Sequence, residues 1–235
     1  MSDIFSREDN LIGKDKRLLL AHKTVALFGL GGVGSFTAEA LARAGVGKLV
    51  ICDGDKVDVT NINRQLYALN STVGKLKTDV AYDRLKDINP NIEVEKFPVY
   101  FSAETLRLFD FQSYDYVVDC VDTVTAKILL CEASKSAYKP VIACLGTGNK
   151  LNPTAFKVGD IYQTKVCPLA KVIRRELRKR NIESLKTVYS EEEPISPLGD
   201  KRVPASISFV PPVAGFIIAS EVIKDLIQSK GEVNE

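Results

Sequence analysis

The stretch Phe28-Gly29-Leu30-Gly31-Gly32-Val33-Gly34 follows a short apolar run and precedes a segment with helical periodicity. Glycines at such a junction let the backbone approach phosphate groups, and the N–H groups that begin the helix supply donors. Asp53 ends the next apolar run, 19 residues after Gly34, where a carboxylate can accept hydrogen bonds from a ribose. The glycine pattern alone is a weak signal, but with the strand, the helix and the acid it predicts a nucleotide-binding turn.

The first 150 residues alternate short apolar runs, typical of buried parallel strands, with longer amphipathic stretches. We expect strands at Thr24–Phe28, Lys48–Cys52, Tyr116–Val121 and Val141–Leu145. We expect helices at Val33–Ala44, Val73–Ile88 and Thr123–Tyr138. Strands that alternate with helices predict an α/β fold with a doubly wound, mainly parallel, Rossmann-like sheet.

The remaining residues do not continue this alternation and predict an irregular C-terminal extension. The segments expected there are a strand and turn, a basic helix, an exposed loop and a final helix, at Leu151–Thr164, Pro168–Arg180, Glu191–Pro204 and Val213–Gln228. We expect one domain over residues 1–235, with a nucleotide-binding half at 1–150 and a second half at 151–235.

Composition excludes several classes of protein. The chain has 235 residues, 45% hydrophobic and 26% charged, and no apolar run approaches the ~20 residues that span a bilayer. The polar start has no apolar signal segment, so we expect a cytoplasmic protein with no membrane partner. The five cysteines form no CxxC pair and His22 is the one histidine, which argues against disulfide frameworks, zinc knuckles and histidine-based catalysis.

Polar residues beyond Asp53 indicate which nucleotide binds. A dehydrogenase holds a pyrophosphate with backbone amides, whereas a reactive triphosphate needs cations and a carboxylate for Mg²⁺. The loop Thr60-Asn61-Ile62-Asn63-Arg64-Gln65, Lys77 at a helix start and Asp122 after a strand offer these groups, with Asp122 as the metal candidate. Each could instead be a solvated surface charge or, for Asp122, a helix cap, but their combination with the glycine turn favours ATP and Mg²⁺.

These motifs, with FVPPVAGFIIASEVIK near the end, resemble the E1-like adenylating superfamily, which includes the molybdopterin and thiamine sulfur-carrier activators. The resemblance implies a homodimer that binds ATP and Mg²⁺ and adenylates a carboxylate, with the second half of the chain serving substrate and dimer contacts. It assigns catalysis to Arg64, Lys77, Asp122 and Arg7, the last lent across the dimer. It assigns contacts with ATP or its metal to Gly32, Asp53, Asn61, Asn63, Arg64, Lys77 and Asp122. The glycine turn and the loop after the second strand add Gly29, Gly31, Gly34 and Gln65 to the expected nucleotide contacts.

Departures from the superfamily pattern select a branch. The sulfur-carrier activators commonly carry two CxxC pairs, and ubiquitin-type enzymes have additional domains for which this chain has no room. The segments SREDNLIG, TGNKLNPT and the basic stretch after DIYQTKVCP instead resemble the tRNA threonylcarbamoyladenosine dehydratases. That branch uses ATP to activate the threonyl carboxylate of a modified adenosine in tRNA, which then cyclises as AMP leaves. The alternative substrate is the C-terminal Gly-Gly of a ubiquitin-like or sulfur-carrier protein, and a sulfur-relay partner stays open.

The segment between Lys165 and Lys186 holds eight Lys or Arg and two Glu. Such a cluster suits tRNA phosphates, although an amphipathic helix with a solvated face has the same pattern. The residues expected to contact nucleic acid are Lys171, Arg174, Arg175, Arg178, Lys179 and Arg180. Cys167, before this helix, has basic neighbours that could activate a thiol, but cyclisation needs no thioester. An NAD-dependent oxidoreductase and a non-catalytic tRNA-binding protein are two further hypotheses, disfavoured by the missing hydride-transfer residues and by the intact cationic set.

Overall fold

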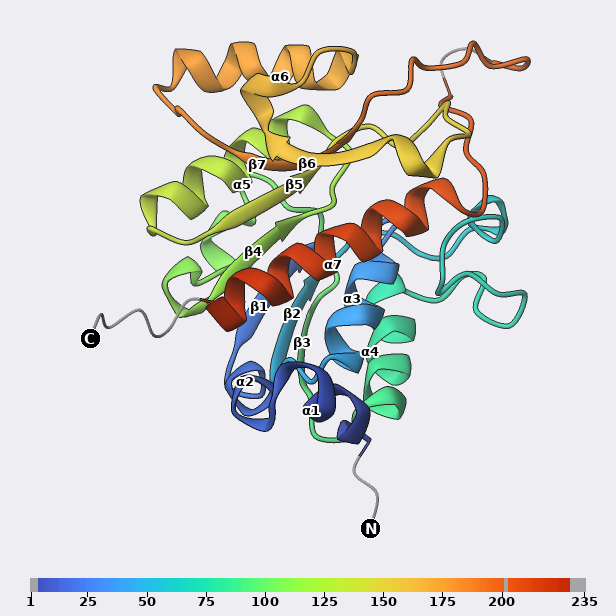
Figure 1. The fold of residues 1–235 in the computed structure, drawn as a ribbon. Helices are drawn as coiled ribbons and strands as arrows, with labels where there is room; N and C mark the ends of the chain where they lie inside the picture. Colours follow the sequence, from blue (N-terminus) through green and yellow to red (C-terminus); the bar gives the residue numbers. More distant parts are fainter. Residues whose placement is uncertain (1–3, 201–202, 229–235) are drawn as a thin grey trace.

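Within residues 4–200 and 203–228, which the structure describes, the computed structural model forms one seven-stranded sheet in the order β3-β2-β1-β4-β5-β7-β6 (Figure 1). Strand β6 runs antiparallel to β7, and the other neighbouring strands are parallel. The strands are β1 Thr24–Phe28, β2 Lys48–Cys52, β3 Glu93–Phe97, β4 Tyr116–Asp119, β5 Val141–Cys144, β6 Phe156–Asp160 and β7 Lys186–Ser190. The expected doubly wound, mainly parallel α/β fold is confirmed.

Helices cover both faces of this sheet. They are α1 Ser6–Ile12, α2 Lys14–Leu20, α3 Gly34–Arg43, α4 Lys77–Ile88, α5 Val124–Ser136, α6 Pro168–Lys179 and α7 Val210–Gln228. Helices α3, α4 and α7 lie together on one face, and α5 and α6 lie on the other (Figure 1). No helix in the described part of the chain is both long enough and apolar enough to cross a bilayer.

Alternate residues of the central strands feed two separate cores, as the two-residue period of a strand requires. In β1, Val25 and Leu27 join the core under α3 and α7, whereas Ala26 and Phe28 join the core under α5 and α6. Phe28 also meets the rings of Phe101, Phe109 and Phe111, at centroid distances of 4.8, 5.1 and 6.0 Å. Because β1 is buried on both faces, its sequence is a continuous apolar run rather than an alternating one.

The strands expected from the sequence are present, but some boundaries differ. Helix α4 begins at Lys77 rather than Val73, because Gly74 takes a φ of +86° in the preceding turn. Helix α7 begins at Val210 rather than Val213, because the two prolines that follow Val210 occupy the first turn, where a missing N–H is tolerated. Strands β3 and β7 and helices α1 and α2 were not predicted from the sequence.

The two expected halves of the chain share this sheet. Strand β7, from the second half, pairs in parallel with β5, from the first, through residues such as Thr187 and Ala143. Beyond the sheet, residues 191–200 and 203–206 run as a strap across its carboxyl edge. The expected exposed loop corresponds to this strap, except that Lys201 and Arg202 lie outside the described residues. Segments from both halves therefore meet at the edge where ligands bind in open α/β sheets.

Candidate functional site

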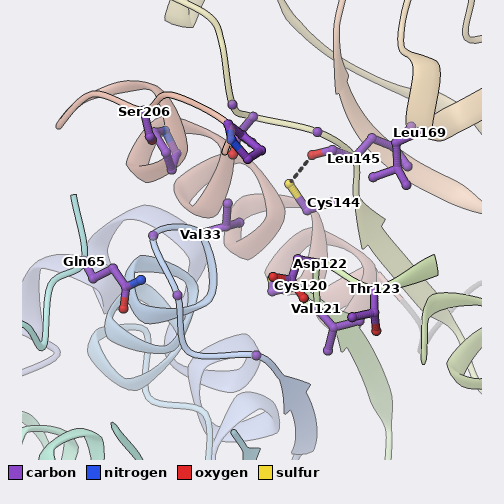
Figure 2. A pocket seen from close by; sticks show the side chains of 18 of the residues that line it. Val33, Gln65, Cys120, Val121, Asp122, Thr123, Cys144, Leu145, Leu169 and Ser206 are labelled. Carbon is purple, nitrogen blue, oxygen red and sulfur yellow. Dashed lines mark hydrogen bonds between the residues drawn. The ribbon is translucent and has the colours of Figure 1, made fainter. Parts of the chain in front are cut away.

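A cavity of about 880 Å³ opens at the carboxyl ends of the parallel strands. Its walls come from the glycine turn after β1, the segments after β2, β4 and β5, the start of α6 and the strap. Figure 2 shows Gln65 on one side, Leu145 and Leu169 on the other, and Asp122 between them. The cavity thus extends from the expected nucleotide site into the second half of the chain.

Two glycines of the turn after β1 are required by close backbone contacts. Gly29 has a φ of +91°, and a Cβ there would lie 2.6 Å from the carbonyl oxygen of Cys120. A Cβ at Gly34 would lie 1.8 Å from the carbonyl oxygen of Gly29, far inside any tolerated contact. A Cβ at Gly31, by contrast, would make only an ordinary contact of 3.9 Å with Nε2 of Gln65, and Gly31 and Gly32 both line the cavity. At these two positions the turn presents backbone without side chains to the cavity.

Asp53 holds this turn in place. Its carboxylate accepts hydrogen bonds from the backbone N–H of Leu30 at 2.6 Å and of Asp55 at 2.8 Å. Burial raises the pKa of Asp53, and the nearby ammonium of Lys77 and these two N–H groups oppose the rise. Asp53 lines the cavity, and its observed contacts fix the backbone of the glycine turn.

Lys77 begins α4 and lies almost completely inside the protein, with 4% of its surface exposed. Its Nζ is 2.7 Å from Oδ2 of Asp55 and 3.9 Å from Oδ1 of Asp53. The hydroxyl of Tyr100 donates to the other oxygen of Asp55 at 2.5 Å. Burial raises the pKa of Asp55, but the hydrogen bonds from Lys77 and Tyr100 lower it more, so the net pKa lies below the usual value.

Asp55 and Tyr100 are site residues that were not predicted from the sequence. Asp55 belongs to the same Asp-Gly-Asp motif as Asp53, so the spacing of the motif was a usable signal. Tyr100 comes from the loop after β3 and reaches the cavity through packing against Gly54, whose Cβ would lie 2.8 Å from the ring. No local pattern marks that contact.

The loop after β2 places Arg64 and Gln65 on the cavity wall. Nη1 of Arg64 donates to the carbonyl of Thr60 at 3.0 Å and to Oδ1 of Asn63 at 2.8 Å. The amide of Asn63 donates to the carbonyl of Ser206 at 3.1 Å, so Asn63 ties the loop to the strap. Among these loop residues Asn61, Arg64 and Gln65 line the cavity and Asn63 does not.

The two acids around the end of β4 have different environments. Asp119 is 1% exposed and forms an ion pair of 3.0 Å with Lys127, itself 2% exposed. Burial raises the pKa of Asp119, and the ammonium of Lys127 opposes the rise. Lys127 also donates to the carbonyl of Cys144 at 2.7 Å. Asp122 is exposed on the cavity wall, which leaves its carboxylate free to meet a ligand (Figure 2).

The far end of the cavity is built from β5, the start of α6 and the strap. Cys167 is 5% exposed there, and a Cβ on Gly146 would lie 3.8 Å from its sulfur. The strap is fastened at Asn149, whose N–H donates to the carbonyl of Ala205 at 2.7 Å and whose Oδ1 accepts from the N–H of Ala205 at 2.7 Å. Lys150, which the sequence analysis also missed, lines this end and is 4% exposed.

Arg7 lies outside the cavity of its own chain, since it is absent from the cavity wall built by the described residues. Helix α1 sits at the edge where the parallel strands begin, opposite to the cavity (Figure 1). There Phe5 packs on Gly45, at 3.1 Å from the position of a Cβ. A contribution of Arg7 to catalysis therefore requires a second copy of the chain.

The six cations expected to contact nucleic acid lie on or directly after α6, but they are not equivalent. Arg174 turns inward and donates to the carbonyl and hydroxyl of Thr164. Lys179, Arg180 and Arg175 surround Glu176, and their hydrogen bonds lower its pKa to about 2. Arg178 stacks over Tyr162 at 5.1 Å, and Lys171 is exposed. The side chains of Arg175 and Lys179 are 69% and 60% exposed, so their charges reach solvent although both pair with Glu176.

Known proteins are similar to this chain in sequence and in fold. A tRNA threonylcarbamoyladenosine dehydratase of Bacillus subtilis is 42% identical over 95% of this chain and 94% of its own. The crystal structure of the Escherichia coli tRNA N6-threonylcarbamoyladenosine dehydratase in complex with AMP matches with a TM-score of 0.90 at 30% identity, over 95% of this chain and 94% of that one. A further crystal structure of that enzyme contains ATP and matches with a TM-score of 0.88.

A more distant relative has a different name and a longer chain. The adenylyltransferase and sulfurtransferase UBA4 of Kluyveromyces lactis is 35% identical over 68% of this chain but only 36% of its own. The ThiF family profile matches residues 5–235, which is almost the whole sequence. This chain belongs to the ThiF family.

Proposed function

We propose that this chain is an ATP-dependent tRNA threonylcarbamoyladenosine dehydratase. The observation that carries the proposal is the 42% identity with the Bacillus subtilis dehydratase over 95% of the chain. The cavity supports it, because backbone glycines, Arg64 and Lys77 are the groups that a triphosphate requires. We further propose that residues 1–235 work as one adenylation domain in the cytoplasm, where 1–150 bind the nucleotide and 151–235 serve the substrate and the dimer.

ATP would bind with its phosphates along the glycine turn and the cationic residues. Arg64 and Lys77 would stabilise the negative charge that gathers on pyrophosphate, and Asp53 would accept from the ribose while it holds the turn. Asp122 suits Mg²⁺, which is commonly held by one or two carboxylates together with phosphate oxygens and water. Such a site needs no larger ligand group, and the described residues contain no cluster of three acids, histidines or cysteines. Bound there, Mg²⁺ would neutralise charge on the phosphates.

Adenylation supplies a leaving group that a carboxylate lacks. An oxygen of the threonyl carboxylate attacks the α-phosphorus of ATP, and the bond to pyrophosphate breaks. A nitrogen of the same adduct then attacks the activated carbonyl carbon and loses its proton, and AMP leaves with the original carboxylate oxygen. The adduct has lost the atoms of one water. Because the attack is intramolecular, the protein needs only to hold the reactive conformer and exclude water.

The tRNA would lie along α6. Lys171, Arg175 and Lys179 present exposed charge on this helix, whereas Arg174 is committed to Thr164 and supports the fold. Cations in such an array bind phosphates through release of counterions, so binding should weaken as salt rises. This arrangement supports recognition of the phosphate backbone next to the far end of the cavity.

A homodimer would complete the site. Exposed apolar side chains occur on the loop after β2, at Val59 and Ile62, and on α7 at Phe216, which is 48% exposed and contacts Phe36 at a centroid distance of 5.7 Å. Such an apolar surface beside a cavity is typical of a subunit interface. Across it, Arg7 of a second copy would reach the phosphates.

The dimer proposal can be tested by mixing two inactive variants. In a mixed dimer of Arg7→Ala with Asp122→Asn, one cavity has an intact Asp122 and receives an intact Arg7. Activity should therefore return on mixing and coincide with a dimeric mass in light scattering. If Arg7 acted within its own chain, the mixture would stay inactive.

The proposed reaction is tested directly by mass. The protein is incubated with ATP, Mg²⁺ and tRNA that carries the threonylcarbamoyl adduct, and the nucleosides are weighed after mild digestion. We expect an ATP-dependent loss of one water, abolished by Asp122→Asn and retained by Asp83→Asn, an exposed acid on α4 outside the cavity wall. An unchanged adduct, with pyrophosphate exchange that depends on a Gly-Gly carrier protein, would refute the proposal and select the activator alternative.

A further inference from the structure

Lys150 is a cation at the far end of the cavity that the reaction proposed above does not use. It follows β5, lines the cavity and is only 4% exposed. Its Nζ donates to the backbone carbonyl of Glu192 in the strap. The carboxylate of Glu192 is already occupied, because its two oxygens accept from the N–H groups of Leu151 and Asn152 at 2.9 Å each.

The charge of Lys150 is poorly compensated. An ammonium has three N–H donors, and within residues 4–200 and 203–228 the carbonyl of Glu192 is the acceptor that the structure records for it. Burial lowers the pKa of Lys150, with the charges of Cys167 and Glu192 opposing the effect. A buried charge without a salt-bridge partner is costly, and an anionic ligand would offset that cost.

The position of Lys150 relative to the phosphate-binding residues suits a second anion. Strand β5 is separated from β1, which carries the glycine turn, by β4 alone. At a spacing of about 4.8 Å between strands, the two ends of the cavity are roughly 10 Å apart. In a displacement at phosphorus, the attacking and leaving oxygens lie on opposite sides. Cations for pyrophosphate at one end therefore leave the incoming carboxylate facing the other end.

We propose that Lys150 binds the carboxylate of the substrate adduct and directs it toward the α-phosphorus of ATP. This inference rests on the proposed function, and it assigns a separate cation to each end of the reaction. Lys150 donates to one carboxylate oxygen while the other oxygen attacks. After adenylation the same ammonium faces the carbonyl oxygen and stabilises the negative charge that develops there during cyclisation.

The enclosure of Lys150 favours a carboxylate over an RNA phosphate. The strap covers this end of the cavity through the paired hydrogen bonds between Asn149 and Ala205, and Ile195 donates its N–H to the carbonyl of Asn149 at 2.8 Å. A phosphate of the tRNA backbone would have to pass the strap, whereas a single extruded base with its short adduct can enter a cavity of about 880 Å³.

Binding without ATP separates this role from catalysis. The dissociation constant is measured for tRNA with the adduct, for the same tRNA without it, and for tRNA whose adduct carries a methyl ester. Wild-type protein should prefer the free carboxylate about tenfold to a hundredfold, the range for a charge-assisted hydrogen bond. Lys150→Met should lose this preference, Lys150→Arg should retain part of it, and Lys14→Met, on the exposed face of α2, should retain all of it.

The affinity for AMP and the affinity of wild type for the ester serve as controls. AMP affinity of Lys150→Met should equal that of wild type, which shows that the nucleotide end is folded. The ester comparison in wild type needs no variant, so an equal affinity for ester and acid overturns the inference even if Lys150→Met does not fold. In one outcome, wild type converts the adduct while Lys150→Met keeps both the preference for the free carboxylate and the wild-type KM for the modified tRNA. That result would overturn the role of Lys150 and leave the proposed function standing. If wild type leaves the adduct unreacted, the proposed function fails with it.

Discussion

The ion pair between Asp119 and Lys127 lies beneath the turn that carries Asp122, and its charges are sealed from solvent. The two side chains are each 2% exposed and 3.0 Å apart, and Asp119 also accepts the N–H of Val121 at 3.1 Å. Replacing Lys127 with Met leaves a buried carboxylate without a counterion. We expect Lys127→Met to lower the free energy of unfolding by about 3–5 kcal/mol.

The magnitude follows from opposing contributions. At 3.0 Å, and with an effective dielectric constant of about 20, the attraction is about 5 kcal/mol. Burial costs several kcal/mol for each ion, so the complete pair contributes little net stability. The double variant Asp119→Asn/Lys127→Met removes both charges and keeps an oxygen that can accept from Val121. It should therefore recover at least about 2 kcal/mol relative to Lys127→Met alone.

The loss of stability in Lys127→Met should also depend on pH. Without Lys127, burial raises the pKa of Asp119 further above its unfolded value of about 3.9. A carboxyl whose folded pKa is raised contributes stability below the unfolded pKa, and this contribution is lost as pH rises through the folded pKa. Lys127→Met should therefore approach wild type near pH 4 and fall furthest behind at neutral pH.

Urea denaturation of wild type, both single variants and the double variant gives the complete cycle. Lys135→Met is the matched control, because Lys135 is an exposed residue of the same helix, α5. A Lys127→Met protein within about 1 kcal/mol of wild type at neutral pH, or a double variant whose loss equals the sum of the two single losses, would refute the reasoning.

Three other variants test separate features. Gly34→Ala should abolish nucleotide binding and lower the melting temperature, because its Cβ would lie 1.8 Å from the carbonyl oxygen of Gly29, whereas Gly199→Ala, with nothing within 4 Å, should do neither. Burial raises the pKa of Glu39, but Arg84 and Arg43 lower it more, so its net pKa is below the usual value. A lowered carboxyl pKa contributes stability above about pH 4.5, and this contribution is lost as pH falls. Urea denaturation should therefore show Glu39→Gln to be less stable than wild type at neutral pH, with a smaller difference in acid. Arg175→Gln should reduce the slope of log affinity for tRNA against log salt by about one and weaken all tRNAs similarly, and an unchanged slope would remove Arg175 from the RNA surface.

The buried strands were the predictable part of the fold. Runs such as Thr24–Phe28 and Lys48–Cys52 are apolar because both faces of the sheet are covered, and their boundaries match the structure. Strand β3 was missed because it is an edge strand, and three of its five residues, Glu93–Phe97, are charged. Strand β7 was missed because it begins at Lys186, where the basic segment ends, and its pairing with β5 is decided by long-range contacts.

The candidate site was predictable where the chemistry follows a strand directly. Asp53 and Asp122 come just after β2 and β4, so their place at the carboxyl edge follows from the topology. Tyr100 and Lys150 come from loops that meet the cavity only after the chain has folded, and nothing local distinguishes them from surface residues. From the sequence, Lys77 could equally be a solvated surface charge. In the structure the Asp-Gly-Asp loop contacts Lys77 through Asp55, and only 4% of its surface is exposed.

The cavity wall includes four cysteines, Cys52, Cys120, Cys144 and Cys167. Burial raises the pKa of both Cys52 and Cys144 to about 12, so both thiols stay protonated at neutral pH. Alkylating reagents attack thiolates, and they can reach these sulfurs only when the surrounding segments separate. The wild-type chain thus contains its own reporters of local opening around the cavity: the alkylation rates of the buried Cys52 and Cys144 record how often the surrounding segments separate, without any added label.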